Sequence, residues 1–218
     1  MKTKQLKPYL LLWSTQTLSA LGSGMTSYAL VLWLYLRSGS ALETALLSVC
    51  SYAPYVIMSI FAGALSDRWN KKRTMLVCDL LAALSTVTVF LLIRTQVLCA
   101  WHLYALNALN GLMNTIQQPA GEIAATLLIP KEYYQKTSGL RSFSQSLNSI
   151  LTPILATALF AFAGIDAVIA ADLLTFALAF FTLLVFIQIP EQEAPVRARE
   201  SLIASARARG FAGCGKTR

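Results

Sequence analysis

Apolar residues in this chain occur in long runs that are separated by short polar segments. Six such runs cover residues 9–36, 44–66, 74–93, 97–121, 142–165 and 167–189. Each run suffices to cross ~30 Å of hydrocarbon as a helix, which takes roughly 20 residues. Strands of a membrane barrel would show short segments of alternating polarity, and the sequence has no such alternation. The pattern therefore predicts an all-α membrane protein with six transmembrane helices, here called the predicted spans.

Basic residues are distributed unevenly between these spans. With six spans, all but two of the basic residues fall on one side of the membrane: Lys2, Lys4, Lys7, Arg68, Lys71, Lys72, Arg73, Lys131, Lys136, Arg141, Arg197, Arg199, Arg207, Arg209, Lys216 and Arg218. Only Arg37 and Arg94 fall on the other side. Because basic loops stay in the cytoplasm, the bias predicts a multi-pass inner-membrane protein with both termini cytoplasmic.

Composition agrees with a membrane environment and excludes several other classes. The chain is 56% hydrophobic and only 13% charged, and its net charge of +8 is explained by membrane orientation without a nucleic-acid partner. The four cysteines form no Cys-x-x-Cys pair, and His102 is the only histidine. A zinc site needs several close ligands, so we expect no metal and no other cofactor.

The segment between the second and third spans has an ordered set of turn and charged residues. It reads GALSDRWNKKR, and its key positions are Gly63, Asp67, Arg68, Asn70, Lys71, Lys72 and Arg73. Composition alone describes a tight cytoplasmic loop, in which Asn70 tolerates a left-handed turn and the basic residues contact anionic headgroups. The order of residues, however, resembles the signature loop of the major facilitator superfamily, with Asn70 in place of a glycine and Lys71 in place of an arginine.

Three further stretches strengthen this resemblance. They are TQTLSALGSGMTSYAL in the first span, QQPAGEIAATLLIP after the fourth and AADLLTFALAF in the sixth. They are similar to the drug-exporter branch that contains macrolide-efflux and enterobactin-export proteins, over about residues 10–190. The resemblance implies proton-driven export of amphipathic small molecules, such as drugs or siderophores. It also implies that this chain matches the N-terminal half of a twelve-span fold.

Polar side chains inside the spans are spaced by three and four residues, which places each set on one helical stripe. These stripes contain Gln16, Ser19 and Ser23 in the first span, Asn107, Asn110, Asn114 and Gln117 in the fourth, and Gln145 and Asn148 in the fifth. Amides should avoid lipid, so they either line a substrate path or hydrogen-bond neighbouring helices. The resemblance favours the path, since helices one, four and five of this fold border its central cavity.

Three acidic residues lie in or near the spans. Asp79 is close to the basic loop, which favours a structural pairing with Arg68 or Arg73. Glu122 and Asp172 are candidates for proton coupling, although the resemblance places the sixth span at the periphery of the fold. Many exporters of the superfamily have an arginine at the position of Asn107, so a proton relay that uses this arginine is absent here.

The last residues, GFAGCGKT (Gly210–Thr217), fit the phosphate-binding pattern Gly-x-x-x-x-Gly-Lys-Ser/Thr. That loop functions between a buried strand and a helix, and residues 191–218 provide neither, so we expect no nucleotide binding. The basic tail is expected to be disordered, and it stops where the family continues into a seventh helix. This ending indicates a truncated or frame-shifted product.

The sequence therefore predicts a secondary active transporter and not an enzyme, with lipid and a small amphipathic substrate as its partners. Alone it should be inactive, and transport would need a separate second half or a homodimer. Two alternatives are open: a non-transporting membrane remnant or interaction protein, and an ATP-driven exporter subunit.

Overall fold

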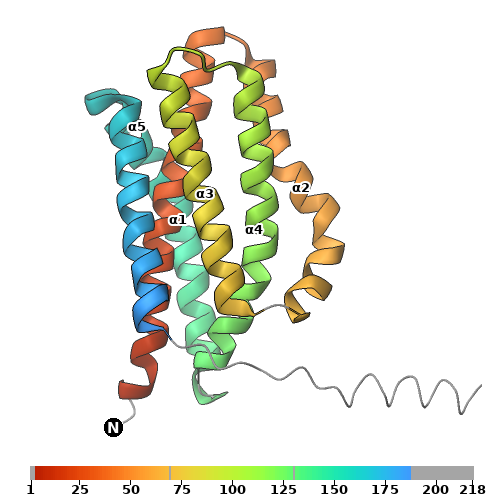
Figure 1. Cartoon of the computed structure of the whole chain (residues 1–218). Helices are drawn as coiled ribbons and strands as arrows, with labels where there is room; N and C mark the ends of the chain where they lie inside the picture. Colours follow the sequence, from red (N-terminus) through yellow and green to blue (C-terminus); the bar gives the residue numbers. More distant parts are fainter. Residues whose placement is uncertain (1–2, 69, 130, 188–218) are drawn as a thin grey trace, which may run out of the picture.

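The computed structural model describes residues 3–68, 70–129 and 131–187, without the side chains of residues 3–5, 59–68 and 131. This part of the chain folds into five α-helices and two short helical segments (Figure 1). They are α1 (Thr3–Ser38), α2 (Ala41–Arg68), α3 (Lys71–Arg94), α4 (Ala100–Leu128), the 3₁₀ helix η1 (Lys131–Tyr133), α5 (Tyr134–Phe181) and the π-helix η2 (Thr182–Phe186). The predicted all-α membrane fold is confirmed at this level.

The long helix α5 reverses direction at Gly164. This residue has φ 77° and ψ −179°, a conformation that favours glycine because it has no Cβ. The first arm (134–163) begins beside α1, where the hydroxyl of Tyr9 donates to the carbonyl of Thr137 at 3.5 Å. The second arm (165–187) starts at the opposite end of the bundle, where Asp166 pairs with Arg94 at 2.9 Å. The two arms are therefore antiparallel, as Figure 1 shows.

Helix boundaries follow local capping chemistry. Asn70 precedes α3 with φ −64° and ψ 114°, and its side-chain oxygen accepts from the backbone N–H of Arg73 at 3.1 Å. Asn70, which would tolerate a left-handed turn, is instead extended, and as N-cap it satisfies a free N–H of the first helical turn. At the start of α4, the backbone N–H of Cys99 donates to Nδ1 of His102 at 3.2 Å.

The helices are packed so that α1 lies inside the bundle and α2 lies at its edge. Helix α1 packs against both arms of α5, α3 packs against α4, and α2 lies along α4 (Figure 1). One hydrophobic cluster contains Leu30, Leu34, Val89, Leu103 and Ile169, from α1, α3, α4 and the second arm. The interior is thus shared by distant parts of the sequence.

Much of the outer surface is apolar, as a lipid environment requires. Phe162 is 92% exposed, and Trp101 is 80% exposed. Four stretches of the described chain are long and apolar enough to cross a bilayer: Leu6–Ser38, Ala41–Met58, Lys71–Arg94 and Tyr134–Phe186. Helix α4 is not among them, because the amides of its polar stripe lower its mean hydropathy. With about 1.5 Å per residue, the 29 residues of α4 nevertheless exceed the thickness of the hydrocarbon core.

Candidate functional site

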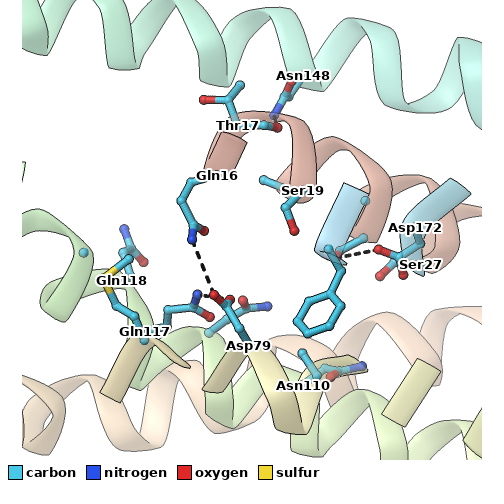
Figure 2. A pocket seen from close by; sticks show the side chains of 18 of the residues that line it. Gln16, Thr17, Ser19, Ser27, Asp79, Asn110, Gln117, Gln118, Asn148 and Asp172 are labelled. Carbon is cyan, nitrogen blue, oxygen red and sulfur yellow. Dashed lines mark hydrogen bonds between the residues drawn. The ribbon is translucent and has the colours of Figure 1, made fainter. Parts of the chain in front are cut away.

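A cavity of about 610 Å³ lies between α1, α3, α4 and both arms of α5. All nine residues predicted for a substrate path line it, namely Gln16, Ser19, Ser23, Asn107, Asn110, Asn114, Gln117, Gln145 and Asn148. Several of them surround the cavity in Figure 2. Its lining also includes Asp79, Thr86, Gln118, Glu122, Arg141 and Asp172. The volume is in the range of sites that enclose drug-sized molecules.

Helix α4 contributes the largest group of amides because its polar residues share one stripe. Asn107 is 8% exposed, and its amide nitrogen donates to the carbonyl of Leu103 at 3.0 Å. Its amide oxygen accepts from the hydroxyl of Ser51 on α2 at 3.1 Å. Asn107 therefore also connects α4 to α2. Within the described part of the chain, the buried amide oxygen of Asn110 has no hydrogen-bond partner.

The polar residues of α1 and α5 also serve as contacts between helices. The amide nitrogen of Asn148 donates to the backbone carbonyl of Thr17 at 3.3 Å. Ser23 donates to the carboxylate of Asp172 at 2.9 Å. Ser23 and Asn148 therefore line the cavity and also hydrogen-bond neighbouring helices. A role in a substrate path remains a prediction.

Asp79 lies in the wall of the cavity. Its carboxylate accepts from the amide nitrogen of Gln16 on α1 at 3.4 Å and from that of Gln117 on α4 (Figure 2). Among the described side chains, the ion pair expected with Arg73 is not formed; the side chain of Arg68 lies outside the description. Asp79 is the ninth residue of α3 and lies about two turns inside the helix, which places it deeper than the loop.

Asp172 is buried between three helices and faces the same cavity. It is 3% exposed, and it accepts from Ser23 at 2.9 Å and from Thr86 on α3 at 3.3 Å. The sixth span was expected at the periphery of the fold, and the second arm nevertheless turns the side chain of Asp172 toward α1 and α3. An exposed carboxylate in lipid would be costly, and two hydroxyl donors reduce that cost.

The other proton-coupling candidate, Glu122, lies in a more polar environment. It pairs with Arg141 of the first arm at 2.9 Å, and the two side chains are 48% and 37% exposed. The pair joins α4 to α5 at the end of the cavity near the start of α5. It is therefore accessible to solvent, in contrast to Asp172.

The signature loop is only partly described. Gly63, Asp67 and Arg68 belong to the segment without described side chains, and residue 69 is outside the description. Lys72 donates to the backbone carbonyls of Leu184 at 3.0 Å and Ile187 at 2.7 Å. The loop is thus fastened to the C-terminal end of the second arm, where a cation compensates free carbonyl groups. The tail 191–218, with GFAGCGKT, lies outside the described residues.

Comparison of the sequence with known proteins gives several matches. The sequence model of the protein family described as Major Facilitator Superfamily matches residues 12–213. Macrolide efflux protein A from Streptococcus pyogenes is 26% identical over 180 residues, which are 83% of this chain and 44% of that protein. Its namesake from Enterococcus faecalis is 27% identical over 153 residues, 70% of this chain and 47% of that protein. The multidrug efflux pump Tap from Mycolicibacterium fortuitum is 30% identical over 125 residues, 57% of this chain and 30% of that protein. The chain thus spans less than half of the curated relatives that it matches.

Proposed function

This chain belongs to the Major Facilitator Superfamily, and we propose that it forms one half of a secondary exporter of amphipathic small molecules. Members of this family are transporters and not enzymes. The relatives named for macrolide or multidrug efflux support export as the direction of transport. Drugs and siderophores are the substrate classes that we expect.

The proposed topology has six spans, with both termini in the cytoplasm. Helices α1 to α4 supply four spans, and the two antiparallel arms of α5 supply two more. The basic residues Lys72 and Arg141 then lie on the cytoplasmic side, whereas Arg37 and Arg94 lie on the opposite side. The stacking of Arg37 over Trp33 and of Arg94 over Phe90 suits an aromatic membrane interface.

The observation that carries the proposal is the convergence of the nine predicted residues on one cavity. Amides and hydroxyls from α1, α4 and α5 alternate there with apolar side chains such as Leu12, Met75 and Phe176. A mixed surface of this kind suits a molecule with both apolar and polar parts. Transport would require this cavity to open alternately to each side, by rocking against a second half.

Proton coupling is proposed to involve Glu122 or Asp172. Asp172 has the burial that makes a carboxylate sensitive to its surroundings, and Glu122 has the access to solvent that proton exchange needs. Asn107 stands where the family resemblance implies an arginine, and it is hydrogen-bonded to Ser51 and Leu103 and does not carry charge. Coupling in this chain would therefore depend on these acids.

The second half of the path is proposed to come from a second copy of this chain or from a separate six-span chain. A transport assay on cells in which crosslinking shows this chain to be a monomer should show no export of a macrolide or an amphipathic dye. Co-expression with a matching second half should restore export, and an uncoupler that collapses the proton gradient should abolish it.

Two results would contradict the proposal. Export by the chain alone, as a monomer, would overturn the half-cavity model. Export that persists with the uncoupler would overturn proton coupling. The double variant Asn110→Leu/Asn114→Leu tests the cavity itself, because it keeps α4 helical but removes polar groups from the lining, and it should lower export in the co-expressed system.

A further inference from the structure

Two polar connections join α1 and α3 at different levels of the cavity. Gln16 binds Asp79 at the first level, and Ser23 and Thr86 both bind Asp172 at the second. The levels are seven residues apart on each helix (16 to 23 and 79 to 86), which is two turns and ~10 Å. The cavity therefore contains two buried carboxylates, one at each level.

The two carboxylates differ in the kind of group that donates hydrogen bonds to them. Asp172 is enclosed by hydroxyls, which can rotate to donate to it or to accept from it. Asp79 receives hydrogen bonds from the amide groups of Gln16 and Gln117, which supply no positive charge. The two salt bridges among the described side chains involve neither Asp79 nor Asp172. A buried carboxylate without a cation is costly, so a positively charged group gains free energy beside it.

Two other polar groups in the cavity wall lack hydrogen-bond partners among the described residues. The indole N–H of Trp13 and the amide oxygen of Asn110 are buried without a hydrogen bond to any described group. Both residues line the cavity, and the first is a donor whereas the second is an acceptor. The aromatic rings of Trp13 and Phe176 add faces that attract cations. These features suit a ligand that carries charge and polar groups on an apolar body.

We propose that Asp79 determines ligand specificity by binding a positively charged group of the molecule in the cavity, and that Gln16 and Gln117 position its carboxylate. This inference rests on the proposed function only in assuming that the cavity takes a small molecule. The ligand class is an amphipathic monovalent cation. Asp172, which the hydroxyls of two helices enclose, holds the helices together at the second level.

A binding measurement tests this without requiring transport. The purified chain, in nanodiscs of zwitterionic phosphatidylcholine, would be equilibrated with tetraphenylphosphonium in a dialysis cell. The anion tetraphenylborate has the same shape and the opposite charge, so it serves as the ligand control. We expect saturable binding of the cation by the wild type and none of the anion.

Variants then assign the binding to one carboxylate. Asp79→Asn should weaken cation binding about tenfold or more, since it removes the charge and keeps the shape. Asp79→Glu should retain most of the affinity, and Gln117→Leu should lower it several-fold. The matched control is Asp166→Asn, which removes an acid outside the cavity lining and should leave affinity unchanged. Circular dichroism and size exclusion would verify folding, and Gln117→Leu replaces Asp79→Asn if the latter fails to fold.

The outcomes separate this inference from the proposed function. Equal affinity of folded Asp79→Asn and wild type would overturn the inference even if the co-expressed protein exports. Absence of saturable binding, or equal binding of the anion, would overturn it as well. Charge-dependent binding that is lost in Asp79→Asn would support it, even if no export is ever observed.

Discussion

Helices α1 and α2 follow each other in the chain and are both apolar, yet they occupy opposite environments. In an apolar 18-residue window of Leu6–Ser38 in α1, 33% of the residues are buried inside the protein, whereas only 6% of Ala41–Met58 in α2 are buried. Helix α1 lies between the two arms of α5, and α2 lies at the edge along α4 (Figure 1). Similar hydropathy therefore does not fix the place of a helix in the bundle.

The difference between these helices lies in their side-chain patterns. Helix α1 presents Gln16 and Ser23 to the cavity, and its Gly22 lies directly against the backbone of the second arm. Helix α2 exposes a stripe of large apolar residues, namely Leu42, Leu46, Val49, Tyr52 and Val56. Among described residues, α2 contributes no side chain to the cavity. A polar stripe with small residues thus indicates an interior helix, and an apolar stripe indicates contact with lipid.

The largest expected effect comes from glycines that allow close helix contact. At Gly111 an added Cβ would overlap the backbone carbonyl oxygen of Ser51, which joins α4 to α2. At Gly22 it would overlap the hydroxyl of Thr175, a side chain that can rotate. We expect Gly111→Ala to lower the free energy of unfolding by about 3 kcal/mol and Gly22→Ala by about 1–2 kcal/mol. Denaturant titration in mixed micelles would measure both.

Gly139→Ala is the control for these variants. No atom lies within 4 Å of an added Cβ at this helical position, so the substitution should be neutral or slightly stabilising. A larger loss of stability for Gly22→Ala than for Gly111→Ala would contradict the expected order. It would mean that α1 packs more tightly against the second arm than α2 packs against α4.

A smaller effect is expected when α1 loses its polar contact with the second arm. Asp172→Ala removes the acceptor of both Ser23 and Thr86. The hydroxyls can turn partly to the cavity or to backbone carbonyls, so we expect a loss of about 2 kcal/mol. The same micelle titration measures it, and Asp166→Ala, which breaks an exposed ion pair, should cost less than about 1 kcal/mol. Equal effects would show that Asp172 does not hold the helices together.

The helical architecture could largely be predicted, since apolar runs identify helices in a membrane. The helices nevertheless extend beyond the runs: α4 continues to Leu128 and α5 begins at Tyr134, whereas the spans were predicted to end at 121 and to begin at 142. Hydropathy detects only the apolar part of a helix, and polar turns at its ends continue the same hydrogen bonding. The start of α4 at Ala100, rather than at 97, reflects the turn around Gln96 with its positive φ of 58°.

The candidate site could be predicted where spacing places polar residues on one stripe, as with Asn107, Asn110 and Asn114. For Asp79, the nearness of basic residues in the sequence favours a pairing with Arg68 or Arg73. Its spacing of seven from Thr86 is the signal that would have placed both on the cavity side of α3. The position of Asp172 could not be predicted from spacing, because it depends on how the second arm of α5 packs after the reversal at Gly164.

The smallest effect is expected where α2 makes a neutral polar contact. Ser51 donates to the amide oxygen of Asn107 at 3.1 Å and lies within reach of the carbonyl of Leu47 at 3.2 Å. Ser51→Ala should cost about 0.6 kcal/mol, which is typical of a neutral hydrogen bond between membrane helices. Ser48→Ala is the matched control, because Ser48 is exposed and its hydroxyl bonds only within its own helix, to Thr44 at 3.3 Å. A cost for Ser51→Ala as large as that for Asp172→Ala would mean that polar bonds anchor the edge helix as firmly as the interior one. The contrast between α1 and α2 would then rest on apolar packing alone.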